Sequence, residues 1–449
     1  MMQKTKSKGK INWIDCIFFI YLLSTILEKF KWNIFGWGCD LFTLCTAIFF
    51  VVLFVYFAAA NKKIVLNKTL KALALYFFVF LVYCLFQFPF LQHIDTIHVQ
   101  YVKGVITFCI QIIAFFNFVM LINLLGDRFS FEYIAKMFYY ITIVNVLYCI
   151  VQSLYHDIDL VLIKIFKSDV TRWGMDSYGK IGRVTGLLLE SNFNGAFLLI
   201  GFINEVGMIL RNNEKKKSKK VVLLIFTFLT LLELIFTFSR TAYLGFAVFG
   251  LYFFIQANKE LKKIILFLGG SGLLVAAVLF FVWPAFQEII RVRFSFLFGD
   301  TSIMEDSHFK ILIEAMQIYT QNFITVIFGV GRNCLNCYYQ SMFGYEMMKA
   351  HNYYVQTLCE MGIIGLGLFL YYLYVLWHSA KNKGLSGKIF KMIIIATIFT
   401  NFTYDSLERN FNIVLLIFAL ALALCERQSE VGGTFKIGIG KRCNLWQNR

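Results

Sequence analysis

Proline and charged residues are both scarce in this 449-residue sequence. Only 2 residues are proline and 15% are charged, whereas 59% are hydrophobic. A soluble domain has about 25% charged and about 45–50% apolar residues, so the composition excludes a soluble enzyme. Many secondary transporters build their binding sites from helices that are broken at glycine or proline. With Pro89 and Pro284 as its prolines, this chain is predicted to form mostly unbroken helices; one apolar run with Gly269, Gly270 and Gly272 is the exception.

Cysteine is present, but its distribution does not suit a structural metal site. Most of the 11 cysteines stand singly inside apolar runs, where a thiol behaves as a small apolar side chain. Cys334 and Cys337 form the one close pair in the sequence. Two thiols alone do not make a structural zinc site. This pair is therefore either a local disulfide or two free thiols.

Long apolar runs fill most of the chain. A helix needs about 20 apolar residues to cross the hydrocarbon core of a membrane. On this basis the sequence predicts an all-α polytopic membrane protein, with a single transmembrane domain over residues 1–449. The twelve predicted spans are residues 11–30, 39–60, 72–92, 101–125, 134–155, 185–210, 221–238, 241–257, 264–283, 353–378, 389–403 and 411–425.

The basic residues indicate how these spans are oriented. If residues 1–10 and 426–449 are both cytoplasmic, 28 of the 43 Lys and Arg residues fall on the cytoplasmic side. The other 15 fall on the outer side, and 10 of them belong to two long outer segments, residues 156–184 and 284–352. Cytoplasmic loops are enriched in Lys and Arg, whereas long loops follow this rule only weakly. This placement accounts for the net charge of +17 without a nucleic-acid partner.

Both outer segments contain apolar residues at helical spacing. Val161, Leu162 and Ile165 show this pattern in the first segment, and Ile311 and Ala315 show it in the second. Such patterns are typical of helices that lie at the membrane surface or pack over it. Long loops in a compact protein are usually functional when they are structured. We therefore expect the chemistry of the protein in these two segments.

Isolated arginines flank the predicted spans on the outer side. Arg183 precedes the sixth span, and Arg240 stands alone between two apolar runs. An arginine at a membrane boundary either extends toward the lipid headgroups or serves a function. Arg291, Arg293 and Arg332 add further guanidinium groups in the second outer segment. Because a guanidinium group matches the oxygens of a phosphate, this set at membrane level fits a lipid diphosphate.

A histidine stands at the end of the second outer segment. His351 directly precedes Asn352 and the start of the tenth span. A lone histidine is usually structural, but an imidazole beside a membrane-level cavity can accept a proton from a hydroxyl group. Asn352 either caps the following helix or contacts a substrate. Glu360, inside the span, either orients His351 or an arginine, or pairs with a polar neighbour.

Four motifs in this part of the chain resemble those of the O-antigen polymerase and ligase superfamily. Each motif is weakly specific alone, but their order, their spacing and the long outer segment before the tenth span make the set specific over about residues 180–370. The motifs are Arg183-Val184-Thr185-Gly186 with Asn192, then Ser239-Arg240, then Phe328-Gly329-Val330-Gly331, then Ala350-His351-Asn352-Tyr353 with Leu358-Cys359-Glu360-Met361-Gly362-Ile363-Ile364-Gly365.

The sequence departs from the family pattern at two places. Members of the family often have an arginine at the start of the amphipathic outer helix, where this chain has residues 306–310. They also often have a proline shortly before the glycine pair, where this chain has Thr325, Val326 and Ile327. The resemblance implies that His308 or Lys310 replaces the missing arginine.

The resemblance implies a fold, a reaction and a location. The fold is a GT-C-like glycosyltransferase architecture, with a large helical outer loop before the tenth span. The reaction is polymerisation of a surface polysaccharide, O-antigen or capsule, from repeat units linked to polyprenyl diphosphate. It takes place on the extracytoplasmic face of a bacterial cytoplasmic membrane. A flippase and a chain-length regulator are the implied protein partners, and neither a metal nor a cofactor is required.

The same resemblance implies a role for each candidate residue. Arg183 and Arg240 bind the diphosphate and stabilise its charge while the glycosidic bond breaks. His351 deprotonates the attacking hydroxyl group, with inversion at the anomeric carbon. The remaining candidates are assigned to substrate binding, and they are Arg291, Arg293, Arg332, Asn192, Asn352, Glu360, His308 and Lys310.

Several alternatives stay open at the level of the sequence. A ligase that moves the finished glycan to lipid A core or another acceptor shares the donor and the site with a polymerase. A flippase of lipid-linked sugars or a twelve-span carrier also fits the span count. Glu305 and Asp306 leave a metal-dependent variant open, and Asp40 leaves open a scheme like that of oligosaccharyltransferases.

Overall fold

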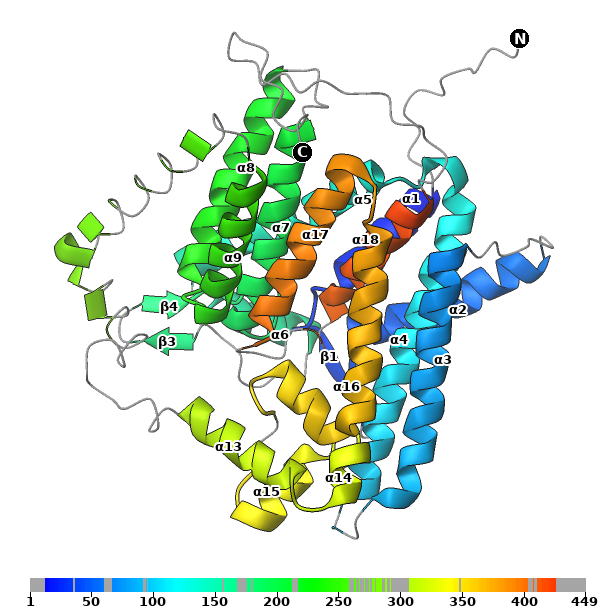
Figure 1. Ribbon diagram of the computed structural model, residues 1–449. Helices are drawn as coiled ribbons and strands as arrows, with labels where there is room; N and C mark the ends of the chain where they lie inside the picture. The colour runs from blue at the N-terminus through cyan, green and yellow to red at the C-terminus, as the bar shows by residue number, and fades with distance from the viewer. Residues whose placement is uncertain are drawn as a thin grey trace.

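The computed structural model describes the chain between residues 13 and 424 with gaps. The gaps are residues 35–36, 60–66, 92–93, 95, 156, 168–175, 179–180, 212–216, 347–348, 403–406 and 408–409, and within 258–306 only scattered positions are described. The described part is mainly helical, and its long apolar helices run side by side in a bundle (Figure 1). These helices are α1 Trp13–Ser24, α2 Leu41–Ala59, α3 Lys68–Gln87, α4 Ile97–Leu125, α5 Phe131–Leu154, α7 Ser191–Arg211, α8 Lys217–Phe236, α9 Arg240–Gln256, α16 Tyr353–Ser379, α17 Gly384–Thr400 and α18 Ile413–Leu424.

Each of these helices coincides with one of the predicted spans. Six of them, α2, α3, α4, α5, α7 and α16, are long and apolar enough to cross a membrane. The predicted span over residues 264–283 falls where only scattered positions are described. The described helices therefore form a mainly α-helical, multi-pass membrane protein.

Several helix starts are fixed by polar side chains that bind the first free backbone N–H groups. Asn67, Ser130 and Ser239 precede α3, α5 and α9, and each side chain accepts a hydrogen bond from the N–H three residues later, at 2.8, 3.1 and 3.3 Å. A side-chain oxygen at this position satisfies a donor that the helix itself leaves without a partner. These short polar residues set the helix boundaries that hydrophobicity alone left imprecise.

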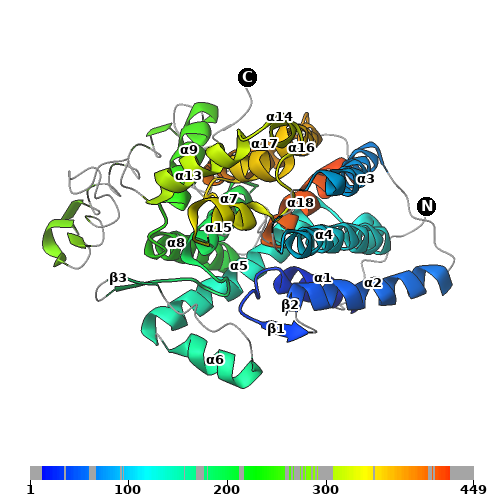
Figure 2. The ribbon, with the colours of Figure 1, turned by 90° about the horizontal axis from the view of Figure 1, so that it is seen from below.

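The core of the bundle lies around α18 and is rich in aromatic side chains. Residues 414–423 of α18 are each at most 3% exposed, and α18 packs against α3, α5, α16 and α17 (Figure 2). Next to it, the ring of Tyr21 stacks between Phe42 and Phe118, with ring centroids 5.6 and 4.6 Å away. The abundance of phenylalanine in the sequence therefore fills the interior of a large helix bundle.

Three shorter helices form a layer at one end of the bundle. They are α13 Ser307–Tyr319, α14 Phe323–Phe328 and α15 Leu335–Phe343, and they lie beside the lower halves of α3, α4 and α16 in Figure 1. Their apolar faces, which include Ile311, Ala315 and Tyr339, share one buried cluster with Ile97 and Tyr101 from α4. The helical spacing predicted in residues 284–352 is confirmed by α13, and the placement of this segment on the outer side of a membrane stays a prediction.

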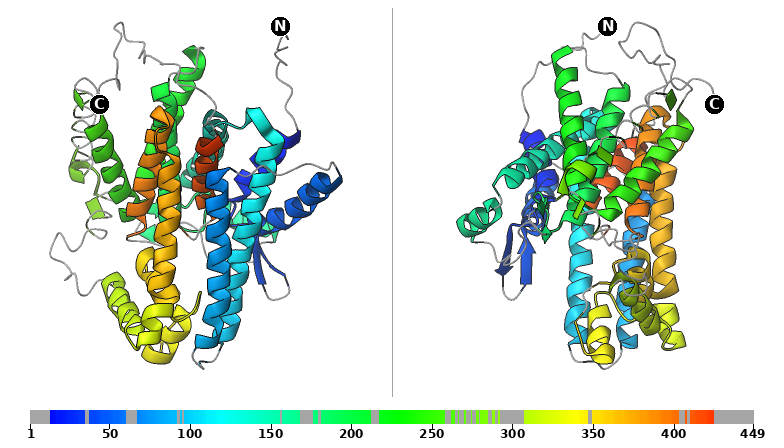
Figure 3. Two further views of the ribbon diagram at one scale, coloured as in Figure 1. Left: turned by 45° about the vertical axis from the view of Figure 1, so that its right-hand side comes forward. Right: turned by 90° about the vertical axis from the view of Figure 1, so that its left-hand side faces the viewer.

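The remaining elements are two short hairpins and a surface helix. Strands β1 Lys31–Ile34 and β2 Trp37–Asp40 are antiparallel and lie at the outside of the bundle (Figure 3). Strands β3 Asp176–Tyr178 and β4 Ile181–Arg183 form the second hairpin. The predicted helix in the first outer segment is present as α6 Ile158–Phe166.

Candidate active site

Arg183, the last residue of β4, is buried against the turn between α8 and α9. Its side chain is held by two backbone carbonyls and one amide: Nε donates to the oxygen of Thr237 at 2.9 Å, and Nη2 donates to Phe238 O at 3.5 Å. Nη2 also donates to Oδ1 of Asn192, at 2.9 Å, in the first turn of α7. Arg183 thus joins β4, α7 and the α8–α9 turn, and Asn192 is its direct partner.

The same turn carries the second candidate arginine. Arg240 is the first residue of α9 and follows Ser239, the capping residue of this helix. The carbonyls that bind Arg183 belong to residues two and three positions before Arg240. A further bond from Val184 N to Phe236 O, at 3.3 Å, ties the chain after β4 to the end of α8. The structure therefore brings Arg183 next to the turn that precedes Arg240, and Arg240 is half-buried there. That both guanidinium groups share one pocket with His351 stays a prediction.

A buried polar network fixes the segment that follows Arg183. Lys29 Nζ lies 2.7 Å from Asp159 Oδ1 and donates to Thr185 Oγ1 at 2.9 Å. Gln152 donates to the same Asp159 and Thr185, while its oxygen accepts from the backbone N–H of Thr185 and Gly186 at 3.0 Å. Lys29, Gln152 and Asp159 thus hold the short stretch of backbone at Thr185 and Gly186 in place.

Breaking this ion pair on one side is expected to destabilise the protein more than removing both charges. Lys29→Met leaves the buried carboxylate of Asp159 without its cation, which typically costs about 3–5 kcal/mol. Lys29→Met combined with Asp159→Asn removes the uncompensated charge and is expected to recover most of this loss. Thermal unfolding of the purified proteins measures the difference; equal midpoints for the single and the double variant would argue against the pairing.

His351 directly precedes α16, and the start of this helix is hydrogen-bonded to residues just after α17. Asn352 caps α16, because its Oδ1 accepts from the N–H groups of Tyr354 and Val355 at 3.0 and 3.1 Å. Its Nδ2 donates to Phe402 O at 2.8 Å, just beyond the end of α17. The capping interpretation of Asn352 is therefore confirmed. His351 itself has a left-handed backbone, with φ of 52°, and a half-buried side chain.

The end of α17 connects this histidine segment to the arginine turn. Asn401, which follows α17, accepts from Tyr353 N at 3.0 Å. One residue earlier, Thr400 lies against Gly245 of α9, where an added Cβ would be 2.6 Å from the threonine methyl group. Gly245 is little more than one helical turn after Arg240. The starts of α7, α9 and α16 therefore lie near the ends of α8 and α17, and α3 and α4 extend beyond this level toward the α13–α15 layer (Figure 1).

The glycines of the last two motifs meet in a reversal of α16. The backbone of Gly362 has φ of 64° and ψ of −172°, which breaks α16 into two segments. As a result the rings of Tyr353 and Phe369 lie 5.0 Å apart, although 16 residues of straight helix would separate them by about 24 Å. The prediction of unbroken helices is wrong here. It rested on the scarcity of proline, but a glycine can break a helix by adopting a backbone conformation that other residues rarely adopt.

The carbonyl groups that lose their helical partners at this reversal accept hydrogen bonds from the backbone after α14 and from side chains of α3. Val330 N and Gly331 N donate to the carbonyls of Cys359 and Glu360, at 2.8 and 3.0 Å. From α3, Tyr83 Oη donates to Met361 O, and Gln87 donates to the Glu360 carbonyl, each at 2.7 Å. The glycine motif after α14 and the motif inside α16 therefore bind each other through their backbones.

Glu360 is linked to the histidine loop through a residue that the sequence analysis missed. The carboxylate of Glu360 accepts a hydrogen bond from Gln356, and Gln356 Oε1 accepts from the backbone N–H of Ala350 at 2.7 Å. Ala350 directly precedes His351. Glu360 can therefore position the loop of His351 through Gln356. The spacing of four residues between Gln356 and Glu360 was the available signal, because such residues share one helix face.

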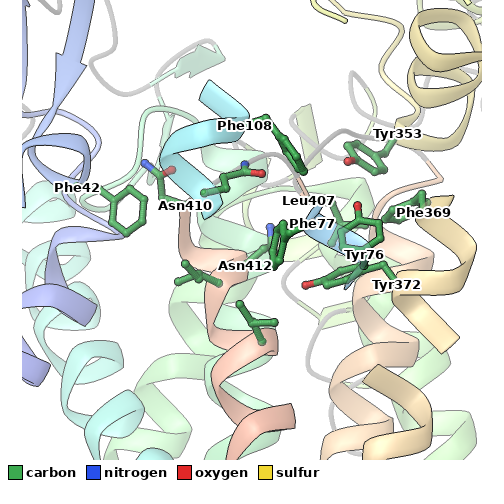
Figure 4. Close-up of a pocket in the computed structure, with 13 residues that line it drawn as sticks. Phe42, Tyr76, Phe77, Phe108, Tyr353, Phe369, Tyr372, Leu407, Asn410 and Asn412 are labelled. Carbon is green, nitrogen blue, oxygen red and sulfur yellow. The ribbon is translucent and has the colours of Figure 1, made fainter. Parts of the chain in front are cut away.

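Arg332 lies away from the arginine turn and lines a cavity together with Glu360. Its Nε donates to Gly104 O at 3.2 Å, and the guanidinium carbon lies 5.5 and 5.3 Å from the ring centroids of Phe80 and Phe108. Two flanking rings and a backbone carbonyl hold the guanidinium group in one orientation. Figure 4 shows the larger neighbouring hollow, which has Phe108 in its wall.

The other candidates of the second outer segment have less defined surroundings. Lys310 is exposed in α13, where its Nζ lies 3.8 Å from Glu314 Oε1. Arg291 is described at a single exposed position, whereas Arg293 and the side chain of His308 lie outside the described residues, as do Glu305 and Asp306. Substrate binding by these residues stays a prediction.

The structure also decides between the alternatives for the cysteine pair and shows the contacts of Asp40. Cys334 and Cys337 are buried free thiols at the start of α15, so the disulfide alternative is wrong. Asp40 accepts from Thr43 N at 2.8 Å and from Asn410 Nδ2 at 2.7 Å, which joins the β1–β2 hairpin to the start of α18. These contacts give Asp40 a structural role.

Comparisons with known proteins converge on one family. Residues 225–370 match the family model described as O-antigen ligase. The chain is also 26% identical, over 205 residues, to the teichuronic acid biosynthesis protein TuaE of Bacillus subtilis (strain 168). This alignment covers 44% of the present chain and 41% of the relative. Together the two matches confirm that the chain resembles the O-antigen polymerase and ligase superfamily. The family-model match contains both Arg240 and His351.

Proposed function

We propose that this protein is a membrane glycosyltransferase that polymerises polyprenyl-diphosphate-linked repeat units of a surface polysaccharide. The observation that carries the proposal is the contact of Arg183 with the α8–α9 turn, which directly precedes Arg240. The end of α17 links this part of α9 to the loop in which His351 precedes α16. Positive groups for a diphosphate and a base for a hydroxyl are the two requirements of this transfer. The family match adds the expectation of surface polysaccharide synthesis.

In this mechanism the two arginines have different tasks. Arg240 is half-buried and contacts the diphosphate directly. Arg183 is 4% exposed, so it contributes charge and holds the α8–α9 turn in place. As the glycosidic bond to the diphosphate breaks, negative charge grows on the leaving oxygen, and fixed guanidinium groups stabilise it.

His351 acts on the other reactant. Its imidazole accepts the proton of the attacking sugar hydroxyl, whose oxygen forms the new bond to the anomeric carbon. The bonding electrons leave with the polyprenyl diphosphate, and the configuration inverts. Gln356 and Glu360 act as positioning residues, because they hold the backbone before His351.

The proposed location follows from the distribution of charge. The arginine turn and the histidine loop are assigned to the extracytoplasmic side of a bacterial cytoplasmic membrane, because the basic loops lie at the other ends of the helices. Within the single transmembrane domain, residues 156–184 and 284–352 are then the outer loops. A flippase that delivers the substrate and a regulator of chain length are the expected protein partners.

A ligase is the second candidate, because the matching family model is described as O-antigen ligase. It uses the same donor and the same residues, and only the acceptor differs. Purified protein in lipid vesicles with lipid-linked single repeats separates the candidates. A polymerase produces longer lipid-linked chains. Transfer that occurs only to an added lipid A core acceptor identifies a ligase, and movement of the substrate across the bilayer without any transfer identifies a transporter.

Arg240→Lys is expected to lower chain growth by about tenfold or more, although the charge is retained. Lysine lacks the planar fork of donors that binds two phosphate oxygens at once. The initial rate of transfer with purified protein and lipid-linked repeats measures the effect. Arg128→Lys, at an exposed position between α4 and α5, is the matched control and is expected to keep the wild-type rate. Full activity of Arg240→Lys would mean that charge alone suffices.

A chelator of divalent cations is expected to leave the transfer rate unchanged. Diphosphate is a good leaving group, and two arginines supply the positive charge that a metal ion otherwise provides. The rate is measured in the same vesicle assay before and after EDTA treatment. Inhibition that added Mg²⁺ or Mn²⁺ reverses would contradict this expectation and favour a metal-dependent variant.

A further inference from the structure

Two hollows adjoin each other beside the histidine loop. They share five wall residues, which come from α3, α4 and α16: Tyr76, Phe108, Gln111, Tyr353 and Phe369. The larger hollow extends to residues around the start of α18, and Figure 4 shows how its side chains surround the space. We call the two hollows together the α3–α16 cavity.

The walls of the α3–α16 cavity combine aromatic faces with hydrogen-bonding groups. Eight tyrosine and phenylalanine side chains from α2, α3, α4 and α16 lie in its walls. Between them lie the amides of Gln111 and Asn410, and the smaller hollow adds the charged groups of Arg332 and Glu360. A few placed polar groups among aromatic side chains are typical of a site that binds and orients a small polar ligand.

This lining suits a sugar ring better than a lipid tail. A sugar offers hydroxyl groups that donate to a carboxylate and accept from a guanidinium group or an amide. Its C–H faces pack on aromatic rings, whose faces carry partial negative charge. A polyprenyl tail, by contrast, would bury Arg332 and Glu360 against hydrocarbon, which is costly for charged groups.

The position of the cavity relates it to the acceptor. Tyr353 lines both hollows and is two residues from His351. The ring of Tyr353 is fixed by Phe369, and its backbone is fixed by Asn401. Neither Arg183 nor Arg240 belongs to the lining of either hollow. The arginine turn and the α3–α16 cavity therefore approach the histidine loop from different elements.

We propose that the α3–α16 cavity binds a sugar ring of the acceptor glycan, with Arg332, Glu360 and Gln111 bound to its hydroxyl groups. The identity of this sugar as part of the acceptor rests on the function proposed above, whereas the binding of a sugar ring rests on the lining of the cavity alone. In this arrangement the donor diphosphate lies at the arginine turn and the acceptor sugar lies in the cavity. His351 stands between them, where it can take the hydroxyl proton.

Photo-crosslinking identifies the occupant without depending on catalysis. Tyr372→p-benzoylphenylalanine places a reactive ketone in the wall of the larger hollow, and Leu407→p-benzoylphenylalanine does so from another element if the first variant folds poorly. Tyr374→p-benzoylphenylalanine is the matched control, because Tyr374 lies on the same helix and is 59% exposed. The protein also carries His351→Asn, so that the probe is not consumed.

The probe is the lipid-linked single repeat isolated from a strain that lacks this protein, compared with polyprenyl diphosphate alone. We expect a sugar-containing adduct at position 372 or 407 that is at least tenfold more abundant than at 374. An adduct that forms equally with polyprenyl diphosphate, or no enrichment over position 374 at either site, overturns the proposal. A sugar adduct in this variant, together with no transferase activity of the protein that keeps His351, would support the cavity and refute the enzyme instead.

A kinetic variant tests whether the bound sugar is the acceptor. Gln111→Leu removes one hydrogen-bonding side chain from the shared wall. We expect the KM for an added acceptor glycan to rise about tenfold, while the KM for the lipid-linked donor stays the same. A rise in the donor KM alone would overturn the assignment to the acceptor.

Discussion

Gly362→Ala is expected to prevent most of the protein from folding. The backbone of Gly362 lies in a region that only glycine reaches at low cost, and a Cβ there would be 2.1 Å from the carbonyl oxygen of Ile327. Ile327 cannot move away easily, because the following residues donate to the carbonyls of α16. We expect a loss of about 3 kcal/mol or more, from backbone strain and this collision together.

The yield of monodisperse protein and its unfolding midpoint in detergent measure this effect. Gly367→Ala is the matched control, because Gly367 lies in the second segment of the same helix, and a Cβ there meets no atom within 4 Å. Alanine is favoured over glycine inside a helix, so the control is expected to fold at least as well as the wild type. Similar yields for both variants would mean that α16 does not reverse at Gly362.

His351→Asn is expected to stop chain growth while the protein stays folded. The backbone of His351 is left-handed, and asparagine tolerates this conformation better than alanine does. Asparagine offers no base, and loss of general-base help typically lowers a rate by about 10²–10⁴-fold. Lipid-linked single repeats should therefore accumulate in cells that carry this variant, as they should with His351→Ala.

The control for this variant lies at the other end of the same helix. His378 is exposed near the end of α16, so His378→Asn should leave chain length unchanged. Electrophoresis of the extracted polysaccharide measures chain length, and immunoblotting measures the protein level. Normal chains made by His351→Asn at the normal protein level would remove the general-base role.

The sequence predicts those parts of this fold that depend on local hydrophobicity. Apolar runs located the helices of the bundle, and helical spacing located α6 and α13. The role of Asn352 as a cap also follows from its position before a helix. These features depend on a few neighbouring residues, so one sequence suffices to find them.

Features that depend on distant partners were not predictable. Lys29 binds Asp159, which is 130 residues away, and nothing near either residue indicates the pairing. The reversal at Gly362 requires the carbonyls of α16 to find the backbone of Val330 and Gly331. An isolated glycine in an apolar run gives no sign of such a partner. The short strands β1 and β2 were likewise hidden between two apolar runs.

The sequence likewise predicted one part of the candidate site and not the other. The sequence indicated Arg183, Arg240 and His351 by their chemistry at membrane boundaries. It did not indicate that Thr237 and Asn192 hold Arg183, or that Arg332 lies in a hollow whose lining contains neither Arg183 nor Arg240. Chemistry can be read from residue types, whereas the grouping of residues into separate subsites requires the fold.

Binding of the donor to catalytically inactive variants tests the central claim most directly. The claim is that the arginines hold the diphosphate while the histidine takes a proton from the other reactant. The affinity for lipid-linked single repeats is measured with purified His351→Asn and with Arg240→Gln. We predict wild-type affinity for His351→Asn and at least tenfold weaker binding for Arg240→Gln. Unchanged affinity in Arg240→Gln, or lost affinity in His351→Asn alone, would contradict the account.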